Sequence, residues 1–268
     1  MWPQTRMSDH NNTAQSVERA FAVLNLLRDS EAALSVSDIA RALKLSPPTV
    51  HRFLTTLRKC KVVEQDLVTR RYHLGLELLL YSKVVLDRFD WRSRAHPLLG
   101  ELSKDVGETV FMGVLDGYDL VYIDQVDSLE HSLRLTPQIG RRQDAHCTAM
   151  GKVLLAHADA AHLKEFLDRA EFPKRTRNTI TKPQSLRREL EKVRAAGYAV
   201  DWQEAEVGIC CVAAPVIGMG GERIAAISIS GPSQRLEPKG LETALKNAVQ
   251  SAAARISQAI TPSTGGGR

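Results

Sequence analysis

The sequence predicts an α+β protein of two domains: a small helical domain ending in a β-hairpin, and a larger domain of strands and helices. Three observations support this prediction. Apolar residues follow helical spacing in three short segments before residue 60 and then change to strand-like alternation. Farther along the chain, strand-like segments are interspersed with helical ones. The length of 268 residues suits one large domain or two modest ones.

The composition is that of an ordinary soluble globular protein, with 43% hydrophobic and 25% charged residues. It excludes a disordered chain, which would contain fewer Leu, Ile and Val residues. No apolar run approaches the ~20 residues needed to span a bilayer, and no basic-then-apolar leader opens the chain. We therefore expect a cytoplasmic protein with no membrane contact.

The four cysteines show no metal-binding pattern. There is neither a CxxC nor a Cys/His pair at zinc spacing. Without an export signal, the cysteines are expected to be reduced. The sequence therefore predicts neither a metal site nor a cofactor.

The first 75 residues contain three helical segments. The first begins near Ser16, a possible N-cap, and the second begins at Ser35, where Asp38 completes a near capping box. The third begins at Ser46, with Pro47 at the first helical position. Its apolar face has helical spacing and consists of Val50, Phe53, Leu54 and Leu57.

A β-hairpin with a basic tip is expected after the third helix. Lys61–Gln65 and Arg71–Leu74 have strand-like patterns, and Asp66–Arg70 joins them. Helix, short helix, turn, helix and hairpin form the order of a winged helix-turn-helix, a DNA-binding unit.

The polar face of the third helix and the hairpin carry the residue types that DNA recognition needs. Arg52 is the predicted guanine or phosphate ligand, and small polar side chains beside it could reach base edges. Residues 41–71 contain eight Lys or Arg and two acidic residues. A three-helix bundle with a solvated polar face is the alternative. The predicted DNA contacts are Ser46, Pro48, Thr49, His51, Arg52, Thr55, Arg70 and Arg71.

The rest of the chain is expected to form a linker and a sheet domain. Expected strands are Thr109–Val114, Leu120–Val126, Ser132–Leu135, Ile209–Ile217 and Arg223–Ser230, and Pro97 should break or restart a helix. Expected helices are Thr148–His157, Ala160–Asp168, Ser185–Ala196 and a single final helix, Pro238–Ile260. The predicted organisation is a flexible arm (1–13), a DNA-binding domain (14–75), a linker helix (76–91), an effector-binding domain (92–260) and a disordered tail (261–268).

Several ordered motifs resemble the signatures of IclR-family transcriptional regulators, from about Ser16 to Ile260. They are Ser16–Ala20, Ser46–Leu54, Arg71–Gly75, His146–Lys152, Gly197–Asp201, Gly208–Val216 and Ile227–Pro232. The resemblance implies a GAF-like effector-binding fold in the second domain. It also implies dimers through the DNA-binding domains and tetramers through the sensor domains. The residues at 141–144 are more polar than the family pattern, which bears on the choice of ligand.

The resemblance also implies an effector pocket. Its positions are Leu135, Ala149, Met150, Asp201, Cys211, Ser228 and Ser230. The start of a helix near Thr148 offers backbone N–H groups to an anion, and Ser228 and Ser230 share one strand face. A small carboxylate-bearing metabolite would suit this set. Alternatively, the serines form a plain polar strand face, Cys211 fills the core, Asp201 caps a turn and His146 is structural.

The predicted function is a ligand-responsive regulator, a repressor in preference to an activator, that binds a near-palindromic operator. A thiol-dependent enzyme would need a Cys and a base within hydrogen-bond reach. The candidate pairs are His146 with Cys147 and Cys211 with Asp201. Adjacent residues rarely face each other, so His146 and Cys147 form a poor pair, and no G-x-S-x-G elbow is present. We therefore expect no enzyme. A sensor that signals through protein partners is disfavoured by the basic helix and hairpin.

Overall fold

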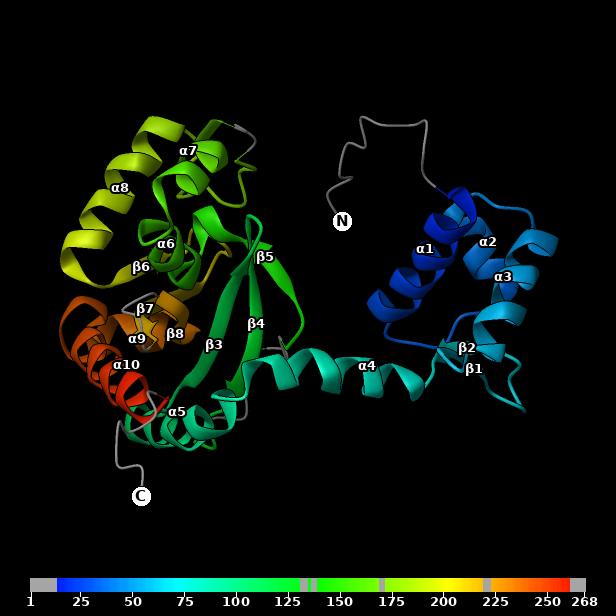
Figure 1. Ribbon diagram of the computed structural model, residues 1–268, viewed down its shortest axis with the longest axis horizontal. Coiled ribbons are helices and arrows are strands. Elements are labelled where there is room, and N and C mark those ends of the chain that lie inside the picture. Colours follow the sequence, from blue (N-terminus) through cyan, green and yellow to red (C-terminus); the bar gives the residue numbers. More distant parts are fainter. Residues whose placement is uncertain (1–13, 131–134, 136–138, 169–171, 219–222, 261–268) are drawn as a thin grey trace, which may run out of the picture. The chain divides into compact units, whose positions relative to one another are not determined.

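The computed structural model describes residues 14–130, 135, 139–168, 172–218 and 223–260 (Figure 1). The predicted arm, the predicted tail and residues 132–134 of the expected strand Ser132–Leu135 lie outside this part of the chain. The chain divides into two compact units, Met1–Arg88 and Phe89–Arg268. None of the described helices has both the length and the apolar character that crossing a membrane requires.

The first unit is a three-helix domain with a hairpin, as predicted. Its helices pack around a core that includes Val23, Ile39 and Leu54, and Tyr72 adds an aromatic ring from the hairpin. The elements are α1 (Gln15–Asp29), α2 (Val36–Leu43), α3 (Pro47–Lys59), β1 (Val63–Gln65), β2 (Tyr72–Leu74) and α4 (Glu77–Leu86). The two strands are antiparallel.

The helix ends follow from local hydrogen bonds. The Ser35 hydroxyl accepts a hydrogen bond from the Asp38 amide at 3.1 Å and the Asp38 carboxylate accepts one from the Ser35 amide, which confirms the capping box. The prediction of Ser16 as the first cap is wrong. The carbonyl of Ala14 already accepts the amides of Val17 and Glu18, so α1 begins one residue before Ser16.

Helix α4 has no buried side chain. It is followed by a 3-10 turn, Asp87–Phe89. Most of its apolar side chains are exposed to solvent, unlike those of an ordinary amphipathic helix, which face a core, and Leu78 is partly buried against the core of the first unit. The exposed apolar side chains of the helix and the residue before it are Leu76, Leu79, Leu80, Tyr81, Val84 and Val85.

The second unit is built on an antiparallel six-stranded sheet of order β5-β4-β3-β8-β7-β6. The strands are β3 (Thr109–Asp116), β4 (Asp119–Val126), β5 (Arg142–Asp144), β6 (Ala199–Trp202), β7 (Ile209–Ile217) and β8 (Arg223–Pro232). The short edge strand β5 pairs with β4 and was not expected, because three polar residues carry no readable alternation.

Helices cover both faces of the sheet, so both faces are buried (Figure 1). One layer contains α5 (Arg92–Val106), α9 (Ser233–Lys239), a π-helical turn (Leu241–Leu245) and α10 (Lys246–Ile260). The other contains a 3-10 turn (Ala145–Cys147), α6 (Ala149–Ala156), α7 (Ala160–Asp168) and α8 (Pro183–Ala196). This α+β architecture, with its N-terminal helix-turn-helix, confirms the predicted fold class.

Two helix predictions are wrong. Pro97 does not break a helix, because α5 runs through it from Arg92 to Val106. The expected single helix Pro238–Ile260 is three elements, because Gly240 takes a left-handed conformation with φ of +79° and ends α9.

Candidate functional site

A cavity of about 380 Å³ lies on the α6 side of the sheet. It contains all seven residues of the predicted effector set: Leu135, Ala149, Met150, Asp201, Cys211, Ser228 and Ser230. Its other lining residues are Phe111, Leu120, Tyr122, Arg141, Gln143, Thr148, Ala205, Glu206 and Ile209. The structure therefore brings the residues of the predicted set together although they lie up to 95 positions apart in the sequence.

Strand register aligns the polar wall of this cavity. Asp201 of β6 lies opposite Cys211 of β7, which lies opposite Ser230 of β8. Ser228 is two residues earlier on the same face, and its hydroxyl lies 3.2 Å from that of Ser230. Both serines are buried, so the pair is a hydrogen-bonded hydroxyl group inside the protein and not a solvated strand face.

Asp201 lines the cavity and also caps a turn. Its Oδ1 accepts the backbone amides of Glu204 at 2.6 Å and Ala205 at 3.4 Å. Burial raises the pKa of Asp201 to about 7, although these amides favour its charged form. The turn-cap alternative is thus correct and compatible with a place in the cavity wall.

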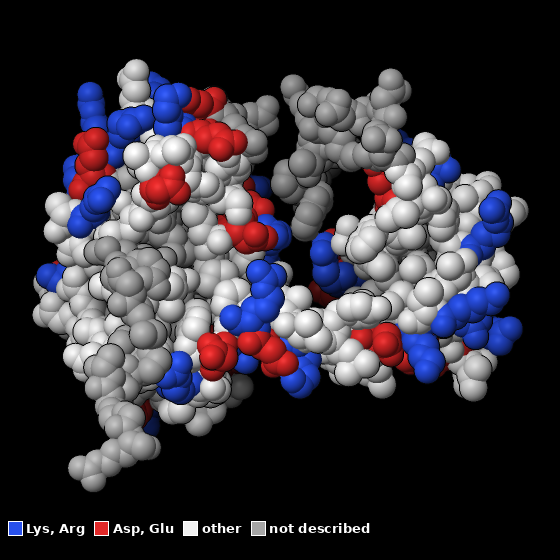
Figure 2. Space-filling view, viewed as in Figure 1, with Lys and Arg blue, Asp and Glu red and all other residues white. Residues whose placement is uncertain are grey.

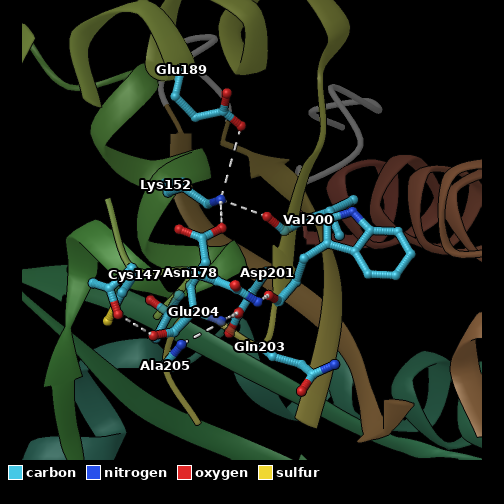
Figure 3. Close-up of polar contacts among 12 residues, drawn as sticks. Cys147, Lys152, Asn178, Glu189, Val200, Asp201, Gln203, Glu204 and Ala205 are labelled. Atoms are coloured by element: carbon cyan, nitrogen blue, oxygen red, sulfur yellow. Dashed lines mark hydrogen bonds and ion pairs between the residues drawn. The ribbon is translucent and has the colours of Figure 1, made fainter. Parts of the chain in front are cut away.

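Lys152 is buried beside this wall (Figure 3). Its ammonium group donates at 2.5 Å to the Glu204 carboxylate and to the Val200 carbonyl, and Glu189 lies 3.9 Å away. The hydrogen bond and the ion pair of Lys152 therefore connect α6 to residues 200–204. Since Ala205 and Glu206 follow directly and line the cavity, the same ion pair fixes that side of the wall.

The first turn of α6 forms another part of the wall. Thr148 caps the helix by accepting the Gly151 amide at 3.2 Å. Gly151 has no room for a side chain, because an added Cβ would lie 2.3 Å from the Ala145 carbonyl oxygen. This close approach sets the start of α6, with Ala149 and Met150, against the cavity.

Sequence reasoning missed the cavity residues of the β5 edge. Gln143 accepts a hydrogen bond from the Tyr122 hydroxyl at 2.7 Å, and Arg141 lies just before the strand. The one feature of the sequence that could have pointed to Arg141 and Gln143 is the unusual polarity of residues 141–144. Arg142 belongs elsewhere, because its guanidinium pairs with Asp116 and Asp119.

The candidate thiol centres do not have catalytic geometry. The His146 ring bonds to the Pro173 carbonyl at 3.2 Å, which satisfies it as a structural histidine. Burial raises the pKa of Cys147 and of Cys211, so both thiols stay protonated. Asp144, His146 and Cys147 have ligand atoms within 4.8 Å of one another. The Asp144 carboxylate of this group is already paired with Arg175 at 2.6 Å.

Most of the predicted DNA contacts are exposed in the first unit. Ser46, Pro48, His51, Arg52, Thr55, Arg70 and Arg71 are exposed, whereas Thr49 is half-buried. The Ser46 and Thr49 hydroxyls lie 2.7 Å apart, and the Thr55 hydroxyl donates to the His51 carbonyl at 2.8 Å. Arg52 forms no ion pair with any residue that the structure describes. Figure 2 shows several Lys and Arg side chains on the surface of this unit.

The hairpin differs from the predicted basic tip. Leu67 and Val68 are strongly exposed at the turn, and the Asp66 carboxylate holds this turn by accepting the backbone amides of Val68 and Thr69. Arg71 donates to the Ala33 carbonyl at 3.0 Å and lies 3.4 Å from Asp38, so it fastens the hairpin to the domain. Arg70 remains exposed.

The helix-turn-helix unit with its exposed basic side chains has the arrangement of a DNA-binding domain, and the second unit contains a cavity in its covered sheet. Two family models match the chain: the IclR helix-turn-helix domain over residues 16–67 and the bacterial transcriptional regulator IclR C-terminal domain over residues 83–258. The chain belongs to the IclR family of bacterial transcriptional regulators, and it is not an enzyme.

Three similar proteins support this assignment. The HTH-type transcriptional regulator BhcR of Paracoccus denitrificans is 35% identical over 248 residues, which cover 92% of this chain and 88% of BhcR. A crystal structure of a putative transcriptional regulator from Rhodococcus sp. RHA1 matches with a TM-score of 0.78 and 31% identity, over 92% of this chain and 98% of that one. An IclR homolog from Microbacterium hydrocarbonoxydans, crystallised with 4-hydroxybenzoate, matches with a TM-score of 0.75 and 25% identity, over 91% and 98% of the two chains.

Replacing Lys152 by Met should destabilise the second unit by about 3–5 kcal/mol, because Glu204 is left as an unpaired buried charge. Replacing Glu204 by Met in the same chain should recover part of that loss. Urea denaturation followed by tryptophan fluorescence measures both effects. A single variant no less stable than the double variant would contradict the role of this ion pair.

Replacing Asp201 by Asn should stabilise the protein increasingly as pH rises. The raised pKa of Asp201 means that the folded state holds the proton more tightly than the unfolded state. The stability that this bound proton contributes is therefore fully present below about pH 4 and is lost as pH rises through about 7. Melting temperatures of the two proteins should be closest at about pH 4 and should diverge steadily up to about pH 7. A constant difference over this range would contradict the burial of an ionisable carboxyl.

Proposed function

We propose that the protein is a cytoplasmic, ligand-responsive repressor that binds a near-palindromic operator as a dimer and senses a small carboxylate-bearing metabolite. The observation that carries the sensing proposal is the cavity, in which Asp201, Cys211, Ser228 and Ser230 converge from three strands. The 4-hydroxybenzoate complex of the Microbacterium hydrocarbonoxydans homolog supports a small organic acid as ligand.

Helix α3 is proposed to enter the major groove of the operator. Arg52 would contact guanine or phosphate, with Thr49, His51 and Thr55 beside it. Ser46 and Pro48 would approach the DNA backbone at the start of the helix. Arg70 and Arg71 would contact phosphate from the hairpin, with Arg71 using donors that Ala33 and Asp38 do not occupy.

Self-association is proposed to cover the exposed apolar residues of the first unit. A helix without a buried side chain is not stable by its own propensity alone and gains most from packing. Besides the apolar side chains of α4, Val17 and Phe21 of α1 are more than half exposed. A second copy would cover these surfaces and set two α3 helices about 34 Å apart, in successive major grooves. Assembly of dimers into tetramers through the second unit follows from family resemblance.

Ligand binding is proposed to change the operator affinity by favouring one arrangement of the DNA-binding units. This requires the ligand to bind the DNA-competent and the incompetent arrangements with different affinities. Repression follows if the unliganded dimer occupies the operator and excludes polymerase. Transcription from the operator with and without the protein separates a repressor from an activator.

Replacing Arg52 by Ala should weaken operator binding by roughly 1–3 kcal/mol, because a bidentate base contact is lost. Fluorescence anisotropy with a labelled operator fragment from the protein's own upstream region measures the affinity. Arg187→Ala is the matched control, since it removes the same charge from an exposed position of α8. Equal affinities of the two variants would contradict the role of Arg52.

Replacing Ser228 and Ser230 together by Ala should abolish the response of the protein to its ligand while preserving operator binding. Both hydroxyls face the cavity and neither lies in the DNA-binding unit. A thermal-shift screen of small organic acids on the unchanged protein identifies the ligand, and operator binding is then measured with and without it. A response that survives both substitutions would show that the pocket assignment is wrong.

A further inference from the structure

The charged side chains that line the cavity are segregated by sign. Arg141 lies at the β5 edge of the sheet, together with Gln143. Asp201 and Glu206 lie at the opposite end, on and just after β6. Because β5 and β6 are the two edge strands of the six-stranded sheet, one end of the cavity is cationic and the other is acidic.

Tyr122 lies between these ends and fixes the polarity of the β5 end. Its ring packs edge-on against Phe111, with centroids 5.2 Å apart. Burial and the nearby Asp201 raise the pKa of its hydroxyl, whereas Arg141 opposes that rise. The hydroxyl therefore stays protonated and donates to Gln143 Oε1. With its oxygen engaged, Gln143 presents its NH₂ group as a donor.

Two adjacent arginines have different surroundings. Arg142 is held by Asp116 and Asp119, outside the cavity. Arg141 lines the cavity and has no ion-pair partner among the residues that the structure describes. A guanidinium next to an amide donor is suited to a carboxylate, which accepts charge-assisted hydrogen bonds.

The other end of the cavity suits a neutral hydroxyl group better than a second carboxylate. Ser228 and Ser230 offer hydroxyls that donate or accept, and the Asp201 carboxyl accepts when charged and donates when protonated. A carboxylate placed beside Asp201 and Glu206 would meet like charges. An alcohol would meet complementary hydrogen-bonding groups.

We propose that the cavity binds a hydroxy acid in one orientation, with its carboxylate at Arg141 and Gln143 and its hydroxyl at Asp201, Ser228 and Ser230. Arg141 is then the residue that selects an acid over its uncharged analogue. This inference rests on the proposed ligand-sensing function. It adds the chemical class of the ligand and the orientation of the ligand in the cavity.

The test compares matched probes on the full chain by thermal shift and calorimetry. The probes are 3-hydroxybutanoate, 4-hydroxybutanoate and 4-hydroxybenzoate, each beside its primary amide and beside the acid that lacks the hydroxyl. At least one hydroxy acid should bind about 10- to 100-fold more tightly than its amide. The same acid should bind about tenfold more tightly than its analogue without the hydroxyl.

Arg141→Gln should remove the preference for acid over amide and leave the preference for the hydroxyl. Arg142→Gln, a neighbouring change of the same charge, should leave both preferences intact. Circular dichroism of both variants checks that they are folded.

Equal acid binding by the Arg141 variant and the unchanged protein would overturn the proposed orientation but not the ligand-sensing function. Loss of the acid preference in the Ser228→Ala, Ser230→Ala protein alone would show the reverse orientation. Binding of no probe would count against both proposals.

Discussion

The buried ammonium group of Lys152 is the constraint on which the cavity side of the sheet depends. Lys152 is 1% exposed, and a charge at that depth is stable only when it is paired and hydrogen-bonded. Glu204 and the Val200 carbonyl provide those partners, and Asp201 holds the turn that brings Glu204 into position. The residues that satisfy Lys152 are therefore neighbours of the residues that form the cavity wall.

The need to pair buried polar groups also explains how the cavity can be polar in a sheet that is covered on both faces. Polar groups removed from water are stable when they bond to one another. Ser228 bonds to Ser230, Tyr122 to Gln143, and Asp201 to two backbone amides. These bonds leave some donors and acceptors directed at a small empty volume, which is what a specific ligand site needs.

Much of the fold was accessible from the sequence because caps and periodicity are local signals. The capping box of Ser35 with Asp38 and the apolar face of α3 predict the helix-turn-helix. The family motifs identify seven of the residues that line the cavity. The features that the sequence did not predict depend on contacts between residues distant in sequence. Arg71 bonds to Ala33, and Gln143 takes its role from Tyr122 on a neighbouring strand. Periodicity alone does not show that α5 continues through Pro97, nor that Gly240 adopts a left-handed conformation that ends α9.

The central claim is that ligand in the sheet cavity and DNA on α3 are coupled within one protein. Thermodynamic reciprocity tests it most directly, because a ligand that changes operator affinity must itself bind with an affinity that DNA changes by the same factor. The measurement is the dissociation constant of the best-binding acid with and without saturating operator. Coupling requires two different constants, with a ratio equal to the ligand-induced change in operator affinity. Identical constants would contradict it.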